Sequence, residues 1–332
     1  GQCGEQSNTN NEPPVADAGP NKTIPKSTPF ILEGTATDPD DPTGESLTYT
    51  WEQMDPQVAP MPPRATNTQG PMFRTFESTS ESHRYMPMIQ TVIQGNTQST
   101  WEVVPSVGRT MNFALTVRDN HVGGGSTAHA NKRITVDGDS GPFKVTSQSE
   151  AETWVIGTMA TVTWDVAGTD GGNVNATHVD IFFSTDGGLT YPITIGSGYP
   201  NNGSAEFYVP SVNTNKGRVM VRAADNIFYS INTKHISVTG NVGVNDFSLE
   251  NFTVFPNPSE GNFSVKFNIE SSDMVSISLY DLRGRLIDQN TFNNISSSIF
   301  QHTMDYSAIQ SGVYFIFVEK GGKKATKKLI KK

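Results

Sequence analysis

The chain has 332 residues, a net charge of −9 and an isoelectric point near 5.2. Such an acidic chain offers no broad basic face outside its lysine-rich end, which excludes nucleic acid as the expected partner. No apolar run approaches the ~20 residues that cross a bilayer as a helix, so we expect no membrane-spanning segment. The length suits two or three domains.

Composition and pattern both indicate an all-β protein. The chain is rich in Thr, Ser, Asn and Gly, and long apolar patterns with the 3.6-residue period of a helix are missing. Short alternating runs separated by turn residues are typical of β-sandwiches. We therefore predict two tandem sandwiches followed by a small antiparallel β-sandwich at the C-terminus.

Residues 1–12 have the polar, Gly-containing composition of a flexible linker. Gly1-Gln2-Cys3 lacks the charged and apolar regions of a signal peptide, so we expect the sequence to be a piece of a longer precursor. Cys3 is the single cysteine of the chain. A lone cysteine suggests a missing partner, a lipid or an intermolecular link, and we favour a partner upstream of this sequence.

The first predicted domain spans residues 13–138. The apolar positions of its late strand are Met111, Phe113, Leu115 and Val117. Their alternation with polar residues predicts a half-buried strand that ends at Asp119-Asn120. Together with Pro13–Pro20, Asp38–Asp41 and Leu47–Glu52, this strand resembles the PKD/cadherin-like immunoglobulin (Ig) family of cell-surface modules. The resemblance implies an Ig-like β-sandwich.

Residues 53–108 depart from that family pattern. The stretch is far longer than a normal connection between strands, and structureless loops of this length are uncommon in compact domains. We therefore predict an insertion whose Pro60–Pro63 and Trp101–Pro105 runs pack over the sandwich.

The second predicted domain spans residues 139–239 and begins at a turn, Asp139–Pro142. Its alternating apolar positions are Val162, Trp164, Val166, Val179, Ile181, Phe183, Val219, Val221 and Ala223. This pattern predicts a second Ig-like β-sandwich with Trp164 in its core. Residues 240–250 have the composition of a linker.

The order of several segments is similar to a narrower family. These segments are Thr50–Gln53, Gly70–Arg74, Phe113–Asn120, Gly141–Val145, Val162–Thr169 and Ser184–Gly188. They resemble the region downstream of the catalytic domain in secreted reprolysin-like zinc metalloproteases of Bacteroidota. The resemblance implies a zinc metallopeptidase domain upstream of Gly1, with the Ig-like modules as its accessory domains.

The chain itself carries no catalytic constellation. The zinc motif of such peptidases needs two histidines four residues apart on a helix, with a glutamate between them. The six histidines are His83, His121, His129, His178, His235 and His302, and no two have that spacing. We therefore assign no catalytic residue and expect no enzyme activity.

Two motifs resemble sequences that are found in enzymes. Gly138–Pro142 resembles the nucleophile loop of trypsin-like proteases, but its place at a domain boundary favours a linker turn. Ser184–Tyr191 matches the Asp-box pattern, whose aspartate and hydroxyls bond their own turn. We interpret both motifs as structural.

Calcium is the expected ligand, if the chain binds one. Asp38, Asp40 and Asp41 lie on one turn, and Asp119 and Asn120 end a strand that reaches the same pole of such a sandwich. Calcium takes six to eight hard oxygen ligands, which loop carboxylates can supply. The resemblance to cadherin-like modules implies the same site. The alternative is a turn cluster in which the aspartates bond their own backbone.

Residues 251–332 carry motifs in a specific order. They are Pro256, Asn257, Pro258 and Gly261, then Leu279, Tyr280, Asp281 and Gly284, then Gly312 and Tyr314, and finally Lys327 and Lys328. Short alternating apolar runs between them predict a small antiparallel β-sandwich. In order and spacing the motifs closely resemble the type A C-terminal sorting domain of the type IX secretion system, which exports proteins across the outer membrane of Bacteroidota.

This resemblance implies the compartment and the partners. The type IX translocon, an outer-membrane carrier barrel and a sortase-like peptidase would bind the domain, and cleavage would fall near residues 240–250. The protein would travel through the periplasm and outer membrane to the cell surface or the medium. Lys320–Lys332 holds seven lysines and no acid, which either blocks strand aggregation at an edge or is recognised by an export partner.

The sequence therefore predicts the non-catalytic C-terminal region of a type IX cargo protein, with a secreted zinc metallopeptidase as the favoured host. The alternative is a cell-surface adhesin or glycan-binding protein built of Ig-like repeats with the same export signal. A third hypothesis, that the modules themselves are hydrolytic, finds no paired acid and base.

Overall fold

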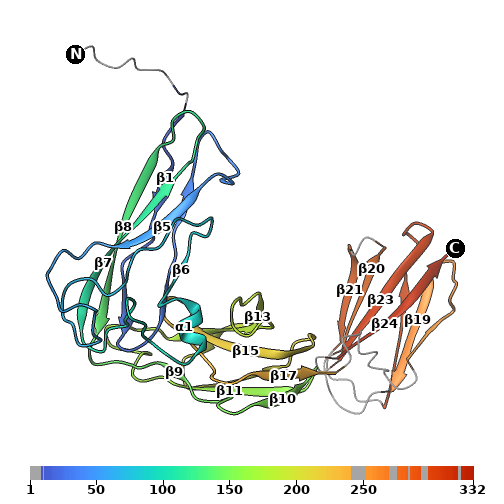
Figure 1. Cartoon of the computed structure of the whole chain (residues 1–332). Coiled ribbons are helices and arrows are strands. Elements are labelled where there is room, and N and C mark those ends of the chain that lie inside the picture. Colours follow the sequence, from blue (N-terminus) through green and yellow to red (C-terminus); the bar gives the residue numbers. More distant parts are fainter. Residues whose placement is uncertain are drawn as a thin grey trace. The chain divides into compact units, whose positions relative to one another are not determined.

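A computed structural model describes residues 9, 11–240, 252–268, 275–282, 285–292, 298–320 and 323–332. In this part of the chain, strands predominate and α1 (Ile89–Ile93) is the single α-helix. The protein divides into two compact units, residues 1–240 and 241–332 (Figure 1). The predicted all-β class is confirmed.

The first module of unit 1 contains α1 and eight strands. The strands are β1 (Val15–Asp17), β2 (Lys22–Pro25), β3 (Phe30–Leu32), β4 (Thr35–Thr37), β5 (Thr48–Gln53), β6 (Arg84–Met86), β7 (Arg109–Arg118) and β8 (Thr127–Asp137). The main sheet has the order β2-β8-β7-β5, and β1-β4 and β3-β6 form two-stranded sheets. β2 runs parallel to β8, whereas the other pairs are antiparallel.

The second module of unit 1 contains nine strands. They are β9 (Lys144–Val145), β10 (Glu152–Val155), β11 (Met159–Asp165), β12 (His178–Ser184), β13 (Ile193–Pro200), β14 (Ser204–Tyr208), β15 (Thr214–Ala223), β16 (Tyr229–Ile231) and β17 (Ile236–Thr239). One sheet has the order β10-β17-β15-β12-β13, with β16 on β15, and the other has the order β14-β11-β9. β10 pairs in parallel with β17, as β2 does with β8, so each module joins an early strand to its last strand.

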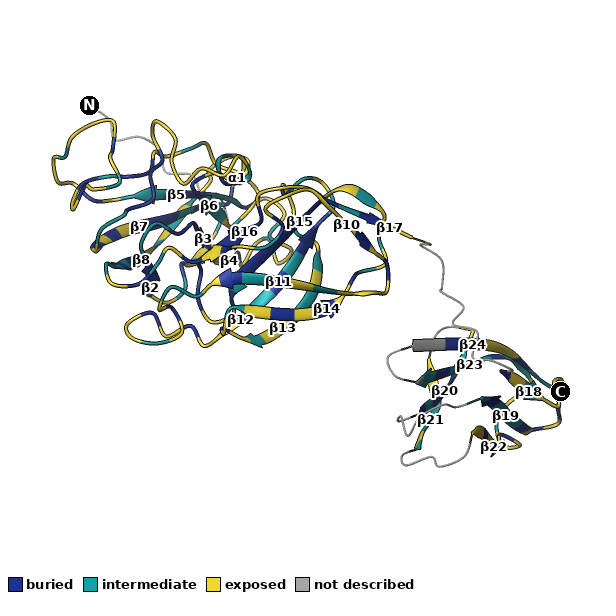
Figure 2. Ribbon diagram, turned by 90° about the horizontal axis from the view of Figure 1, so that it is seen from below, coloured by how far each residue is buried: buried dark blue, intermediate teal, exposed yellow. Residues whose placement is uncertain are grey.

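Buried and exposed residues alternate along the strands as the period-two pattern requires (Figure 2). In β7, Met111, Phe113, Leu115 and Val117 are buried, while Thr110 and Asn112 face outward. Trp164 is also buried, as predicted. The alternation therefore located these core positions correctly.

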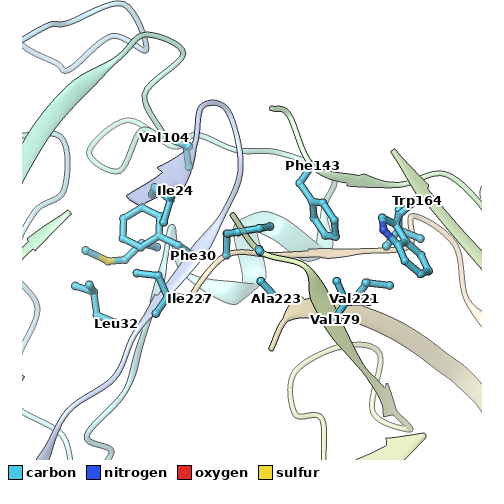
Figure 3. Close-up of a cluster of buried hydrophobic side chains, with 14 of the residues drawn as sticks. Ile24, Phe30, Leu32, Val104, Phe143, Trp164, Val179, Val221, Ala223 and Ile227 are labelled. Atoms are coloured by element: carbon cyan, nitrogen blue, oxygen red, sulfur yellow. The ribbon is translucent and has the colours of Figure 1, made fainter. Parts of the chain in front are cut away.

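The two modules share one hydrophobic core (Figure 3). Phe30 of β3 forms a bridge with Phe228, and the Ile31 amide donates to the Ile227 carbonyl at 2.8 Å. The Phe228 ring also packs edge to face on Phe143, with centroids 5.2 Å apart. Apolar side chains thus run without a break from the first sandwich into the second.

The insertion strengthens this junction. Its helix α1 places Ile89 and Val92 in a buried cluster with Met220 and Tyr229 of the second module. The Trp101–Pro105 run packs over the first sandwich as predicted, because Val103 and Val104 are buried in the shared core, although Trp101 itself remains 45% exposed. The insertion therefore packs against both modules.

The turn between the modules is fixed by close backbone contact. Gly141 has a φ of +95°, and a Cβ at this position would lie 2.4 Å from the Lys26 carbonyl oxygen. A side chain would meet both backbone strain and a clash. The Phe143 amide donates to Thr28 Oγ1 at 3.0 Å, which secures the entry into the second module.

Unit 2 is a small antiparallel sandwich of seven strands in the described residues. They are β18 (Thr253–Phe255), β19 (Asn262–Asn268), β20 (Val275–Asp281), β21 (Leu286–Phe292), β22 (Ile299–Asp305), β23 (Gly312–Lys320) and β24 (Lys323–Lys331). Its two sheets have the orders β18-β19-β22 and β21-β20-β23-β24. Their facing sides bury an apolar cluster that includes Phe263, Phe267, Ile277 and Ile316.

We expect Phe228→Ala to loosen both modules of unit 1, because its ring lies in their shared core. Truncation of a buried phenylalanine costs about 3–5 kcal/mol. Urea unfolding of the full chain measures the loss of stability. Hydrogen exchange of the folded chain should show that protection falls in peptides from both β7 and β15. Tyr208→Ala, at a side chain that is 60% exposed, is the control. Loss of protection in β15 alone would contradict a shared core.

Candidate functional site

The first sorting motif lies beside the end of β24. The side-chain amide of Asn257 donates to the Lys328 carbonyl at 2.7 Å, and its oxygen accepts from the Ile330 amide at 2.9 Å. One side chain thus supplies the donor and the acceptor that a neighbouring strand would offer. Pro256 and Pro258 flank it on an exposed turn.

Ser259 continues this pairing with its backbone. Its amide donates to the Ile330 carbonyl at 3.0 Å, and its carbonyl accepts from the Lys332 amide at 2.9 Å. Gly261 follows with a φ of +149°, where a Cβ would lie 2.6 Å from the Ser307 Cα. The first motif therefore holds β24 through Asn257 and Ser259, and it needs a glycine at position 261 because the chain passes close to Ser307.

The second motif closes the hairpin between β20 and β21. The Asp281 carboxylate accepts from the Arg285 amide at 2.9 Å and from its Nε at 3.2 Å, and the Asp281 amide donates to the Arg285 carbonyl. Gly284, the predicted turn glycine, lies outside the described residues. The aspartate of this motif thus stabilises its own turn.

The remaining apolar motif residues belong to the sandwich itself. Leu279 is fully buried in the core, while Tyr280 is half-buried on the other face of β20. Gly312 begins β23, and Tyr314 is buried with its hydroxyl donating to the Gln310 carbonyl at 2.8 Å. These residues fix the fold of unit 2.

β24 is an edge strand of its sheet. Lys327 and Lys328 are exposed on it, and the Lys327 ammonium lies 5.8 Å from the centroid of the Phe252 ring. Exposed lysines on an edge strand oppose pairing with another chain. They also give this face of unit 2 a positive field that an acidic partner would recognise.

Two of the predicted calcium residues, Asp40 and Asp119, bond the Asn11-Glu12 segment. Asn11 Nδ2 donates to Asp119 Oδ2 at 2.7 Å, and the Glu12 amide donates to the Asp40 carboxylate. Asn120 Nδ2 donates to the Ser46 carbonyl at 2.6 Å, which brings its strand end to the Asp38–Ser46 turn. Asp40 and Asp119 thus bond adjacent residues of the same segment.

The aspartates also bond their own turns. Hydrogen bonds from Thr43 and Ser46 hold the pKa of Asp41 well below its usual range. Asp38 Oδ1 accepts from the Asp40 amide at 2.9 Å. The described residues contain no group of three His, Cys, Asp or Glu side chains placed to hold a metal ion. Calcium at this pole therefore stays a prediction.

One oxygen at the pole fits a cation. Asn11 Oδ1 is buried and has no hydrogen-bond partner among the described residues, although the same side chain lies against Asp119. A buried acceptor without a donor costs free energy. A hard cation would satisfy it together with the neighbouring carboxylates.

Neither of the two motifs that resemble enzyme sequences has catalytic geometry. Ser140 Oγ donates to Asp137 Oδ2 at 2.9 Å, and its described hydrogen bonds include no histidine. In the second motif, Asp186 would have a raised pKa from partial burial alone, but hydrogen bonds from Ser184, Thr190 and Leu189 lower it to about 2. Both motifs are self-bonded turns, as interpreted.

The family comparison covers the C-terminal unit. Residues 253–332 match the family described as "Secretion system C-terminal sorting domain". The predicted type IX sorting domain at the C-terminus is therefore confirmed, and it indicates export to the cell surface or the medium. No curated protein matches the chain.

The similarity to solved structures is low. The FN1–FN3 domains of chicken CNTN1 have 12% identity and a TM-score of 0.22, covering 96% of this chain and 98% of that chain. The Bacteroides ovatus mixed-linkage glucan utilization locus SGBP-B, in complex with a mixed-linkage heptasaccharide, has 13% identity and a TM-score of 0.19, covering 97% and 71%. Among the described residues, no helix has the length and hydropathy for a membrane span.

We expect Asn257→Ala to destabilise unit 2 by about 1–3 kcal/mol, because two hydrogen bonds to the backbone of β24 are lost. Hydrogen exchange of peptides from β24 in the full chain measures the effect. Lys328→Ala is the matched control, because Asn257 bonds the backbone carbonyl of residue 328, which the alanine variant keeps. Equal exchange in Asn257→Ala and the control would contradict the bracing role of Asn257.

Proposed function

We propose that this chain is the non-catalytic C-terminal region of a type IX secretion cargo, and that unit 2 is its export and sorting signal. The match of residues 253–332 to the sorting-domain family carries the proposal. The domain acts by being bound: the translocon and an outer-membrane carrier barrel recognise it, and a sortase-like peptidase removes it. Cleavage falls near residues 240–250, of which 241–250 lie outside the described residues.

The geometry of unit 2 suits recognition as a folded domain. Pro256 to Gly261 form one surface with the end of β24, because Asn257 and Ser259 bond its backbone. Exposed lysines project from the same strand. A partner that binds this surface would therefore contact the first motif and the lysine-rich strand at the same time.

For unit 1 we propose the role of an accessory region. Its shared core supports a stiff spacer that presents a neighbouring domain at the cell surface. We favour a secreted zinc metallopeptidase as the host, on the resemblance of both modules to such proteins. An Ig-repeat adhesin or glycan-binding protein is the alternative.

The export proposal is tested by fusing residues 244–332 to a fluorescent protein that carries a signal peptide. Expression in Bacteroidota strains with and without a functional type IX system should give fluorescence outside the cell in the competent strain alone. A fusion that lacks residues 323–332, and hence β24, should stay in the periplasm of both strains. Periplasmic retention of the complete fusion in the competent strain would refute the proposal.

We also propose that calcium binds at the Asp40–Asp119 pole. A ligand at 100 times its Kd stabilises the folded state by about 2.7 kcal/mol, so calcium should raise the Tm of unit 1 by several degrees over chelator. Asp119→Asn should abolish this shift, whereas Asp165→Asn should keep it, since Asp165 lies in the second module and bonds its own turn. Equal Tm values of the unmodified chain in calcium and in chelator would refute a calcium site.

A further inference from the structure

A pocket of about 220 Å³ opens in the first module, between β5, β6 and the start of α1. Aromatic rings line much of it, among them those of Tyr49, Phe76 and Tyr85, which are all partly exposed. Its polar lining includes Glu77, Arg84 and Gln90. A concave site with aromatic walls and a few polar groups is the usual form of a small-molecule pocket.

Hydrogen bonds hold the walls in place. Tyr49 exchanges backbone hydrogen bonds with Thr79 at 2.8 and 3.1 Å, and the Trp51 indole donates to the Ser82 carbonyl at 2.9 Å. Arg84 Nη1 donates to the Trp51 carbonyl at 2.9 Å. The insertion is thus fastened along the outer edge of β5, and the pocket is preformed.

The charges around the pocket disfavour an ionic ligand. The guanidinium groups of Arg74 and Arg84 lie 5.4 and 4.6 Å from the centroid of the Phe76 ring, which disfavours a further cation there. Glu102 already neutralises Arg84, at 2.8 Å. The Glu77 carboxylate lines the pocket, which disfavours an anion. A neutral ligand fits these charges best.

The rim has unused hydrogen-bonding capacity. The side chains of Glu77 and Gln90 are exposed and have no hydrogen-bond partner in the part of the chain that the structure describes. Burial raises the pKa of the Tyr49 and Tyr85 hydroxyls, so both stay neutral donors. A neutral ligand with several hydroxyls would use these groups, and its apolar faces would lie on the aromatic rings.

We propose that this pocket binds one ring of a neutral saccharide. Its volume is below the roughly 300–1,000 Å³ of pockets that enclose a drug-sized ligand, so a single ring enters and the rest of the chain stays outside. This site goes beyond the export role of unit 2 and does not depend on the nature of the host protein. It gives the insertion a binding role in addition to its place at the junction.

The test uses affinity electrophoresis of the full chain in gels that contain neutral polysaccharides (cellulose derivatives, xylan, mannan and starch) or charged ones (alginate and chitosan). We expect retardation by at least one neutral polysaccharide. Glu77→Ala and Gln90→Ala should each weaken binding about five- to ten-fold, and Tyr49→Ala should abolish it. Glu77 and Gln90 bond no other described group, so their variants should fold normally.

Tyr208→Ala is the matched control, because it removes an exposed aromatic ring from the other module, on β14. Retardation by charged polysaccharides alone, or by none, would overturn the proposal. It would also be overturned if Glu77→Ala and Gln90→Ala bound the neutral polysaccharide as tightly as Tyr208→Ala. A neutral polysaccharide that binds the unmodified chain and loses affinity in the pocket variants would establish the site.

Discussion

The edges of β-sheets must be paired or covered, because their exposed amides and carbonyls otherwise bind other chains. This constraint acts in both units. In the first module, residues 77–84 cover the outer edge of β5 through Thr79, Ser82 and Arg84. In unit 2, Asn257 and Ser259 cover the end of β24, and exposed lysines on that strand oppose its pairing with another chain.

Covering an edge also shapes the surface of each unit. The insertion that covers β5 forms the walls of the aromatic pocket and carries α1 to the second module. The turn that covers β24 joins the first sorting motif to the end of the chain. Residues that stabilise the fold therefore also build the surface that a partner can bind.

The shared core restricts movement between the two modules of unit 1. Modules joined by a polar linker move independently, whereas Phe30, Phe143 and Phe228 pack into one apolar cluster across this junction. The Arg222–Glu33 ion pair reinforces the same junction at its surface. Such a junction suits a spacer that must keep its orientation outside the cell.

The sequence by itself determined the strand class, the core face of strands such as β7, and the sorting motifs, because these depend on local periodicity and residue order. In β23 the alternation favours Val313, Phe315 and Phe317 for the inner face, and this prediction is wrong. Both faces are apolar, and packing buries Tyr314, Ile316 and Val318 instead. Only the tertiary structure brought Asn257 to Ile330, Phe30 to Phe228 and the insertion to β5. These contacts join residues far apart in the chain, and no local pattern encodes which distant edge or face a segment will cover.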